Sequence, residues 1–187
     1  MRVVLMGPPG AGKGTQAVVV AARIGVPHIS TGDLFRANLA QGTPLGLEAQ
    51  RYMSAGEYVP DTVTNAMVRD RIVQDDARPG FLLDGYPRTV AQVHELDVMV
   101  EADGHRIDRV VELTVDTDEI VHRLLKRAQE QGRADDTEDV IRRRMEVYAE
   151  QTAPLTELYR GRGLLVQVDG MGTPDEVTDR VLAALDS

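Results

Sequence analysis

A glycine-rich segment near the start of the chain has the residue types and spacing that bind phosphate groups. It reads Gly-Pro-Pro-Gly-Ala-Gly-Lys from Gly7 to Lys13, which matches the pattern G-x-x-x-x-G-K, and it follows the apolar run Val3–Met6. Glycines allow successive backbone N–H groups to turn inward around an anion, and a helix that starts after the loop adds partial positive charge. Together with the full charge of Lys13, these groups predict a site for the phosphates of a nucleotide.

The residue after Lys13 departs from the usual motif, which has a serine or threonine there to bind Mg²⁺. Gly14 takes this position, and the first hydroxyl belongs to Thr15. We therefore expect Mg²⁺ to be held mainly by phosphate oxygens and water. Asp84 ends the apolar run Phe81–Leu83 and is a candidate for orienting the hydrated ion. The alternative is that Asp84 only bonds the backbone of the turn that it starts.

Several arginines provide positive charge at positions that could surround such a ligand. Arg88 follows the turn after Asp84, so it would face the crevice at the carboxyl end of a sheet strand. Arg123 and Arg127 are four residues apart and share a helix face, although Glu119 is spaced to pair with Arg123. The remaining candidates are Arg36, Arg133, Arg142, Arg143 and Arg144. No residues are arranged as a nucleophile with its base, which is typical of phosphoryl transfer by positioning and charge neutralisation.

The length, composition and net charge of the chain limit the classes of protein to which it can belong. With 187 residues, of which 42% are hydrophobic and 27% charged, the chain suits one α/β core. The absence of cysteine excludes disulfides and thiolate metal sites, and a net charge of −9 argues against general binding to nucleic acids or anionic membranes. No stretch approaches the roughly 20 apolar residues of a membrane span, and no signal peptide is visible, so we expect a cytoplasmic location.

Short apolar runs alternate with longer segments of helical spacing, which indicates a parallel sheet with helices on both faces. The expected strands are Val3–Met6, Val26–Ile29, Phe81–Leu83, Val110–Val115 and Leu164–Val168. The expected helical segments are Thr15–Arg23, Asp61–Gln74, Thr89–Glu101, Asp118–Glu130 and Asp136–Arg160.

Two stretches interrupt this alternation. The segment from Ser30 to Pro60 is mostly helical in pattern, with breaks at Gly42, Pro44 and Gly56, and we expect a small helical insertion there. The polar segment Ala128–Asp136 is expected to be a mobile loop that covers a phosphate site and excludes water. Ordinary connecting structure is the alternative for both.

The chain resembles the adenylate kinases along nearly its whole length. The resemblance is carried, in order, by Gly7–Thr15, Ile29–Arg36, Gly56–Asp61, Asp84–Thr89, Gly132–Asp136 and Thr152–Leu155. It implies reversible, Mg²⁺-dependent phosphoryl transfer between ATP and AMP to give two ADP, by a monomer whose partners are small nucleotides. It also implies an α/β fold of the P-loop NTPase type, a doubly wound parallel sheet of about five strands with helices on both faces and the phosphate loop near its centre.

The same resemblance divides the chain into three parts. Residues 1–29, 60–126 and 138–187 would form the core, residues 30–59 the AMP-binding insertion, and residues 127–137 a short lid. Relatives with a longer lid often carry a zinc-binding cysteine set there, which this chain lacks, so we expect no zinc site.

Roles for individual residues also follow from the resemblance. ATP would be held by Gly10, Ala11, Gly12, Lys13, Gly14, Thr15, Arg123, Arg127 and the backbone of Gly172. AMP would be held by Thr31, Arg36, the backbone of Glu57, Tyr58 and Val59, and by Gly85, Tyr86, Pro87, Arg88, Gln92, Arg133 and Arg144. The residues expected to act in the transfer are Lys13, Asp84, Arg88, Arg133 and Arg144, with Mg²⁺ near Asp84 and Thr15.

Two alternatives stay open. A UMP/CMP kinase would have the same fold, but such kinases tend to carry alanine and asparagine where this chain has Thr31 and Gln92. The Gln92 amide both donates and accepts, which suits an adenine edge. A nucleotide sensor without turnover would lack transfer residues, whereas this chain has the full set named above.

Overall fold

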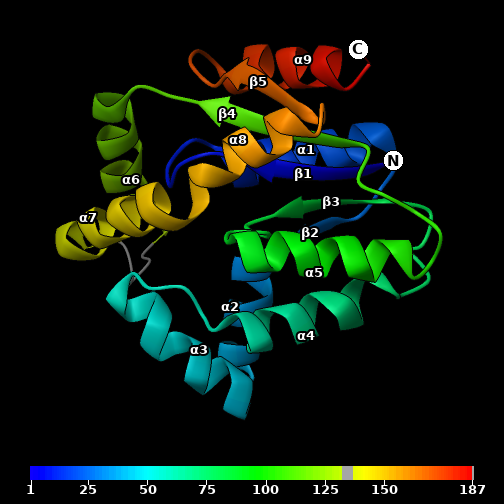
Figure 1. The fold of residues 1–187 in the computed structure, drawn as a ribbon. Coiled ribbons are helices and arrows are strands. Elements are labelled where there is room, and N and C mark those ends of the chain that lie inside the picture. Colours follow the sequence, from blue (N-terminus) through cyan, green and yellow to red (C-terminus); the bar gives the residue numbers. More distant parts are fainter. Residues whose placement is uncertain (132–136, 187) are drawn as a thin grey trace.

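A five-stranded parallel sheet organises the molecule (Figure 1). We describe residues 1–131 and 137–186 of a computed structural model. The strands are β1 (Arg2–Met6), β2 (His28–Ser30), β3 (Phe81–Asp84), β4 (Arg109–Thr114) and β5 (Leu165–Asp169), in the order β2-β3-β1-β4-β5. The expected fold class is confirmed, and β1, which leads into the phosphate loop, is the central strand.

The inner strands are continuous apolar runs because both of their faces are covered. Along β1, Val4 and Met6 face one hydrophobic cluster, and Val3 and Leu5 face the other. This alternation follows from the two-residue period of a strand. The register pairs Leu5 with Asp84, which brings the carboxyl end of β3 beside the start of the phosphate loop.

Helices cover the two faces of the sheet in different sets. Helices α1 (Lys13–Ile24) and α9 (Pro174–Leu185) pack on one face, around Ala17, Val20 and Val181. The opposite face is covered by α4 (Asp61–Ile72), α5 (Val90–Glu101) and α8 (Pro154–Gly161). Of these, α5 and α8 are seen in front of the strands in Figure 1. The doubly wound arrangement is therefore confirmed.

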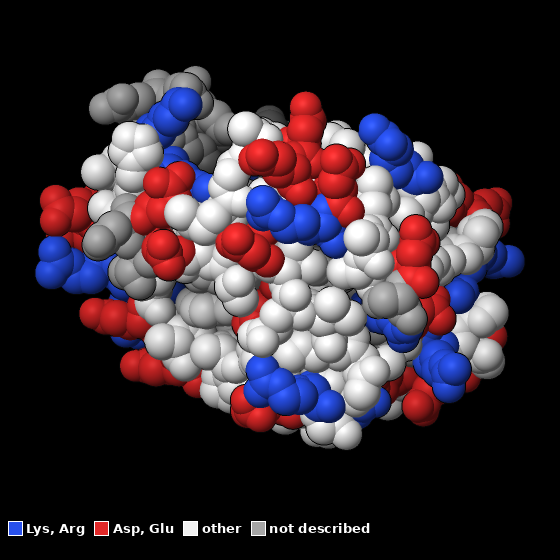
Figure 2. All heavy atoms as spheres, turned by 90° about the horizontal axis from the view of Figure 1, so that it is seen from above, with Lys and Arg blue, Asp and Glu red and all other residues white. Residues whose placement is uncertain are grey.

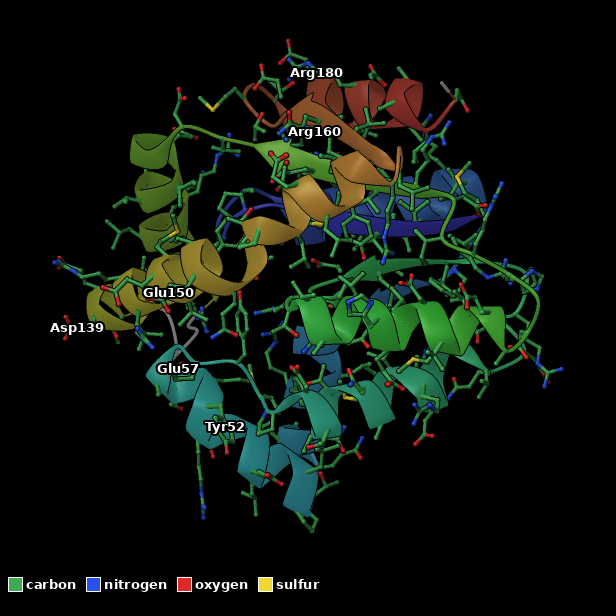
Figure 3. The ribbon with its side chains drawn as sticks, viewed as in Figure 1. Tyr52, Glu57, Asp139, Glu150, Arg160 and Arg180 are labelled. Atoms are coloured by element: carbon green, nitrogen blue, oxygen red, sulfur yellow. The ribbon has the colours of Figure 1, made fainter. Side chains whose placement is uncertain are left out.

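The expected helical insertion is a pair of helices, α2 (Thr31–Ala40) and α3 (Pro44–Ala55), that projects from the sheet. The Thr43 hydroxyl caps α3 by accepting from Gly46 N at 3.0 Å, and Gly56 ends it in the left-handed region at φ 74°. The pair has its own small apolar cluster around Phe35 and Val59. Glu57, at the tip of the insertion, lies under α7 (Glu138–Val147) (Figure 3).

In the second half of the chain, the structure refines one expectation and corrects part of another. The helical segment expected over Asp136–Arg160 contains a π-helical turn, η1 (Tyr148–Thr152), in which the Ala153 N–H donates to the Tyr148 carbonyl oxygen at 2.9 Å, and the following Pro154 has no N–H to continue the α-helical pattern. The loop expected over Ala128–Asp136 is helical as far as Gln131, where α6 (Thr117–Gln131) ends, since glutamine and glutamate are good helix formers. Residues 132–136 lie outside the described part of the chain.

Charged side chains of both signs are interspersed on the face seen from above in Figure 2. Such a mixture provides no extended basic surface on this face, so the positive charge for an anionic ligand must be gathered elsewhere. Among the described residues, no helix combines the length and the apolar character that a membrane span requires.

Candidate active site

A cavity of about 920 Å³ opens at the carboxyl edge of the sheet. Its walls come from the phosphate loop, from α2 and the end of the insertion, from the turn after β3, and from α6, α7 and the loop after β5. This is where parallel α/β sheets bind ligands, because loops of several strands converge there. The volume lies at the upper end of the range for small-molecule sites.

The phosphate loop is built around backbone conformations that only glycine adopts readily. Gly7, Gly10 and Gly12 have φ values of 141°, 84° and 90°. A Cβ on Gly10 would also lie 2.9 Å from the Cγ of Leu124, so the loop packs tightly against α6. Helix α1 begins directly after Gly12, which gives it no side-chain cap, so the first backbone N–H groups are available to an anion.

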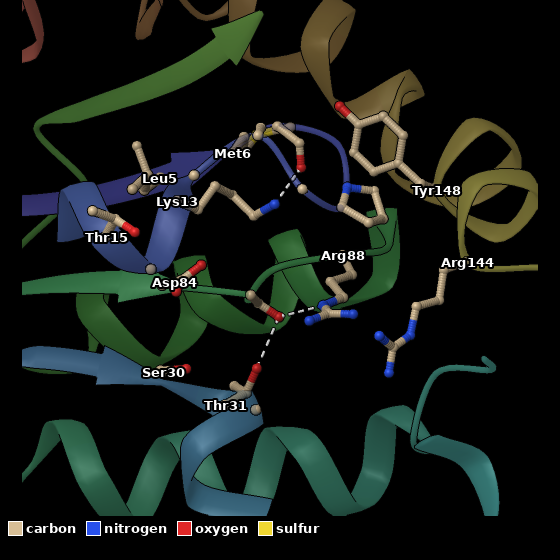
Figure 4. A pocket seen from close by; sticks show the side chains of 18 of the residues that line it. Leu5, Met6, Lys13, Thr15, Ser30, Thr31, Asp84, Arg88, Arg144 and Tyr148 are labelled. Atoms are coloured by element: carbon tan, nitrogen blue, oxygen red, sulfur yellow. Dashed lines mark hydrogen bonds between the residues drawn. The ribbon is translucent and has the colours of Figure 1, made fainter. Parts of the chain in front are cut away.

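The side chain of Lys13 folds back and bonds to the backbone of the phosphate loop. Its Nζ donates to the carbonyl oxygen of Gly7 at 2.7 Å (Figure 4) and to that of Pro8 at 2.8 Å. The ammonium group is therefore held at the mouth of the loop, where it would meet a phosphate chain.

Asp84 ends β3 and lies beside the loop with most of its surface buried. Burial acts to raise the pKa of this carboxyl, but the His28 imidazole, Lys13 and Arg88 lower it by more, so its pKa lies below the ordinary aspartate value. His28 Nε2 is 3.6 Å from Asp84 Oδ2, too far for a hydrogen bond, and has no hydrogen-bond partner among the described residues. Asp84 is thus an ionised carboxylate at neutral pH.

Gly14 has no side chain, so the Asp84 carboxylate can lie close to the phosphate loop. A Cβ on Gly14 would lie 3.7 Å from Asp84 Oδ2, so position 14, where the motif usually has its hydroxyl, faces this carboxylate. Negatively charged oxygen is the ligand type that a hydrated Mg²⁺ prefers. The residues present therefore fit a magnesium ion between the loop and Asp84.

Arg88 is positioned through the turn that follows β3. Its Nε donates to the carbonyl oxygen of Gly85 at 2.7 Å, and the Thr31 hydroxyl donates to the same oxygen at 3.0 Å (Figure 4). Gly85 has φ 80°, and a Cβ there would lie 2.8 Å from Thr31 Oγ1 and 2.9 Å from Arg88 Nη2. One glycine carbonyl thus brings two expected AMP-binding side chains together.

Gln92 lines the cavity, although it is 98% buried, and its amide is held in one orientation. Oε1 accepts from the backbone N–H of Arg88, and Nε2 donates to Asp61 Oδ1, both at 2.7 Å. A backbone N–H can bond only the oxygen and a carboxylate only the nitrogen, so the flipped amide is excluded. Each end of the amide keeps one further position for a ligand, a lone pair on Oε1 and an N–H on Nε2.

The three consecutive arginines on α7 separate in space. Arg142 is mostly exposed and pairs with Glu138, whereas the Arg143 Nε is 2.7 Å from Glu57 Oε1. Arg144 lines the cavity, and Figure 4 shows its guanidinium group and that of Arg88 pointing into the same space. Two cations that share one space create a strong site for a multiply charged anion.

Of the remaining expected arginines, Arg36 and Arg123 line the cavity and pair with nearby carboxylates. Arg36 Nη2 lies 2.5 Å from Asp33 Oδ1. Arg123 forms the expected pair with Glu119, at 2.7 Å, and its Nη1 donates to the Gly170 carbonyl at 3.1 Å. Arg127 belongs to α6, but its side chain is outside the described part of the structure, as is the whole of Arg133.

Among the residues that the resemblance assigns to the site and whose side chains are described, all but Tyr86 line the cavity. Tyr86 lies outside the cavity lining, where its hydroxyl donates to Asn65 Oδ1 at 2.8 Å and has the Gln92 carbonyl oxygen 3.3 Å away. Sequence reasoning assigned no role to four further residues, namely His28, Asp61, Tyr148 and Thr152. Asp61 and Thr152 lie within segments that carry the resemblance, whereas His28 and Tyr148 belong to no motif.

A phosphate loop on the central strand, a carboxylate at the end of the neighbouring strand and converging arginines define a P-loop phosphotransferase that acts on nucleotides. The family model for adenylate kinase matches residues 5–164. The adenylate kinase of Nocardioides sp. (strain ATCC BAA-499 / JS614) is 68% identical over 100% of this chain and 97% of its own length. The adenylate kinase of Kocuria rhizophila is 63% identical over 99% of this chain and 98% of its own length. The adenylate kinase of Thermobifida fusca is 56% identical over 100% of this chain and 99% of its own length.

The chain belongs to the adenylate kinase family. It is a nucleoside monophosphate kinase, which converts ATP and AMP reversibly into two ADP.

Proposed function

We propose that ATP binds with its phosphates in the loop from Gly7 to Thr15, and that AMP binds between the insertion and the turn after β3. The observation that supports this proposal is that the Arg88 and Arg144 guanidinium groups point into one space (Figure 4), in the cavity that Lys13 also lines. In phosphoryl transfer, negative charge is spread over the transferred group and its neighbours in the transition state. Lys13, Arg88 and Arg144 neutralise that charge and hold the reacting oxygens in line.

Thr31 and Gln92 read the base of AMP. The fixed amide of Gln92 presents an acceptor and a donor in one order, which matches the amino group and the ring nitrogen of adenine. Uracil and guanine present a carbonyl oxygen where adenine has its amino group, so they reverse this order. Cytosine has the same order as adenine, so the size of the pocket must exclude CMP.

Asp84, near Thr15, would hold the water shell of the magnesium ion that accompanies ATP. That ion would supply positive charge to offset the negative charge of the phosphates. Residues 30–59 act as the AMP-binding part and 127–137 as the lid, and both close over the nucleotides to exclude water. The monomeric state stays a prediction from the family resemblance, and the cytoplasmic location stays a prediction from the sequence.

The direct test measures ADP formation from Mg·ATP with AMP, CMP, UMP or GMP as acceptor. We expect fast turnover with AMP alone. Turnover that favours CMP or UMP would move the substrate to pyrimidines, and ATP binding without turnover would indicate a nucleotide sensor. Closure has its own test, because small-angle scattering should show compaction with a bisubstrate analogue, and unchanged dimensions would contradict it.

A further inference from the structure

Tyr58 makes two separate contacts to the Arg88 region from the insertion side. The guanidinium carbon of Arg88 lies over the Tyr58 ring, 4.9 Å from its centroid, which is a cation–π geometry. The Tyr58 hydroxyl lies 2.7 Å from Thr152 Oγ1, in η1. One aromatic side chain thus contacts both a cation of the proposed site and the π-helical turn behind it.

The direction of the hydrogen bonds between these residues follows from counting protons. Thr152 Oγ1 lies 2.8 Å from the carbonyl oxygen of Arg88, which can only accept. The single hydroxyl proton of Thr152 is therefore used there, and the Tyr58 hydroxyl must donate to Thr152 Oγ1. Thr152 is buried, so this relay from Tyr58 through Thr152 to Arg88 is shielded from water, where hydrogen bonds are stronger.

Arg88 is consequently held at four places. Gln92 accepts from its backbone N–H, Gly85 accepts from its Nε, Thr152 donates to its carbonyl, and Tyr58 covers its guanidinium face. Gln92, Gly85 and Thr152 belong to the proposed core, whereas Tyr58 belongs to the proposed insertion. An arginine side chain has many rotamers, so a contact on its face restricts which way it points.

We infer that Tyr58 is a positioning residue for the transfer reaction. Its ring and hydroxyl set the orientation of Arg88 toward the AMP phosphate when the insertion packs against the core, which makes Arg88 depend on the position of the insertion. This inference rests on the proposed role of Arg88. It assigns the side chain of Tyr58 a task beyond the backbone contact with AMP that the resemblance implies.

The test compares Tyr58→Leu, which removes ring and hydroxyl, with Tyr58→Phe, which keeps the ring. We expect Tyr58→Leu to lower kcat/KM for AMP about tenfold while KM for ATP stays unchanged, because the phosphate loop is untouched. Tyr58→Phe should regain most of the loss. The matched control is Tyr52→Leu, a tyrosine of α3 in the same insertion (Figure 3), which packs in the apolar cluster and should lower only stability.

A double-mutant cycle separates positioning from packing. In an Arg88→Ala background, Tyr58→Leu should have little further effect, since the side chain that it orients is gone. An equal tenfold loss in both backgrounds, or an unchanged kcat/KM for AMP in Tyr58→Leu, would overturn the inference. Near-normal turnover of Arg88→Ala itself would instead refute the proposed role of Arg88, so the two failures are distinguishable.

Discussion

Asp61 Oδ1 accepts a 2.7 Å hydrogen bond from Gln92 Nε2, and this contact helps to decide which way the Gln92 amide faces. The backbone N–H of Arg88 holds the other end of the same amide. A glutamine with two such partners cannot flip without losing both hydrogen bonds. Its order of donor and acceptor is therefore a property of the folded protein rather than of the ligand.

The first prediction concerns base selectivity. In Asp61→Ala the Gln92 amide can flip at the cost of one hydrogen bond instead of two, so discrimination against UMP and GMP should fall about tenfold or more. Discrimination against CMP should change less, because cytosine does not need the flip. Acceptor competition assays measure this. Gln92→Ala is the reference, and a retained preference for AMP in that variant would remove Gln92 as a base reader.

Charge neutralisation gives the second prediction. Lys13→Met and Arg144→Ala should each slow transfer by orders of magnitude while the fold stays intact, because the transition state loses a cation that water does not replace. Arg142→Ala is a matched control two residues before Arg144, since Arg142 is mostly exposed and pairs with Glu138. Steady-state rates with circular dichroism measure both effects. Equal rates for the two arginine variants would contradict the assignment.

Gly85 and Gly104 provide a matched pair for the third prediction. Both have positive φ, 80° and 72°, so alanine adds about 1–2 kcal/mol of backbone strain at either position. A Cβ on Gly104 meets nothing within 4 Å, whereas one on Gly85 collides with Thr31 and Arg88. Denaturant unfolding should show a larger loss of stability for Gly85→Ala, and only this variant should lose kcat. Normal kinetics in Gly85→Ala would mean that the turn does not position Arg88.

The fourth prediction concerns the loop between β5 and α9. Arg180 Nη1 donates to the carbonyl oxygens of Asp169 at 2.7 Å and Met171 at 2.6 Å, so it supports a loop whose Gly170 and Gly172 line the cavity. Arg180→Ala should raise KM for ATP about three- to tenfold and leave KM for AMP unchanged. The control is Arg160→Ala on α8, which removes a pair with Glu157 (Figure 3). A rise in KM for AMP would contradict the assignment of this loop to the ATP side of the site.

The fifth prediction follows from Tyr86. Burial, and then the nearby Glu95 and Asp61, raise the pKa of its hydroxyl above the ordinary value. Above about pH 10 the unfolded chain releases this proton while the folded protein keeps it, so stability falls as the pH rises. Tyr86→Phe should lower the free energy of unfolding by about 1 kcal/mol at neutral pH, because it loses the hydroxyl's hydrogen bonding. Since phenylalanine does not titrate, the variant should lack the loss of stability at alkaline pH that Tyr86 causes. Urea unfolding should show the difference between the two proteins shrinking above about pH 10, and a constant difference would contradict the raised pKa.

Most of the framework was predictable because its signals lie between neighbours in the chain. The five apolar runs, the breaks at Gly42, Pro44 and Gly56, and the loop from Gly7 to Lys13 depend on periodicity and turn chemistry within a few residues. The two differences concern a helix end and an interruption within a helical segment. Where a polar or irregular segment stays helical, and where its helix is interrupted, depends on its packing against the rest of the protein. The π-helical turn before Pro154 and the end of α6 at Gln131 are both of this kind.

The amino-acid sequence by itself determined the class of fold, the phosphate loop and the set of candidate cations, since these are written in local patterns. Only the tertiary structure decided that Arg143 pairs with Glu57, which way Gln92 faces, and that Tyr58 reaches Thr152. The physical reason is that these outcomes depend on contacts between residues far apart in the chain, such as Tyr58 and Thr152, whose residue numbers differ by 94. Contacts of that kind leave no periodic trace in the sequence.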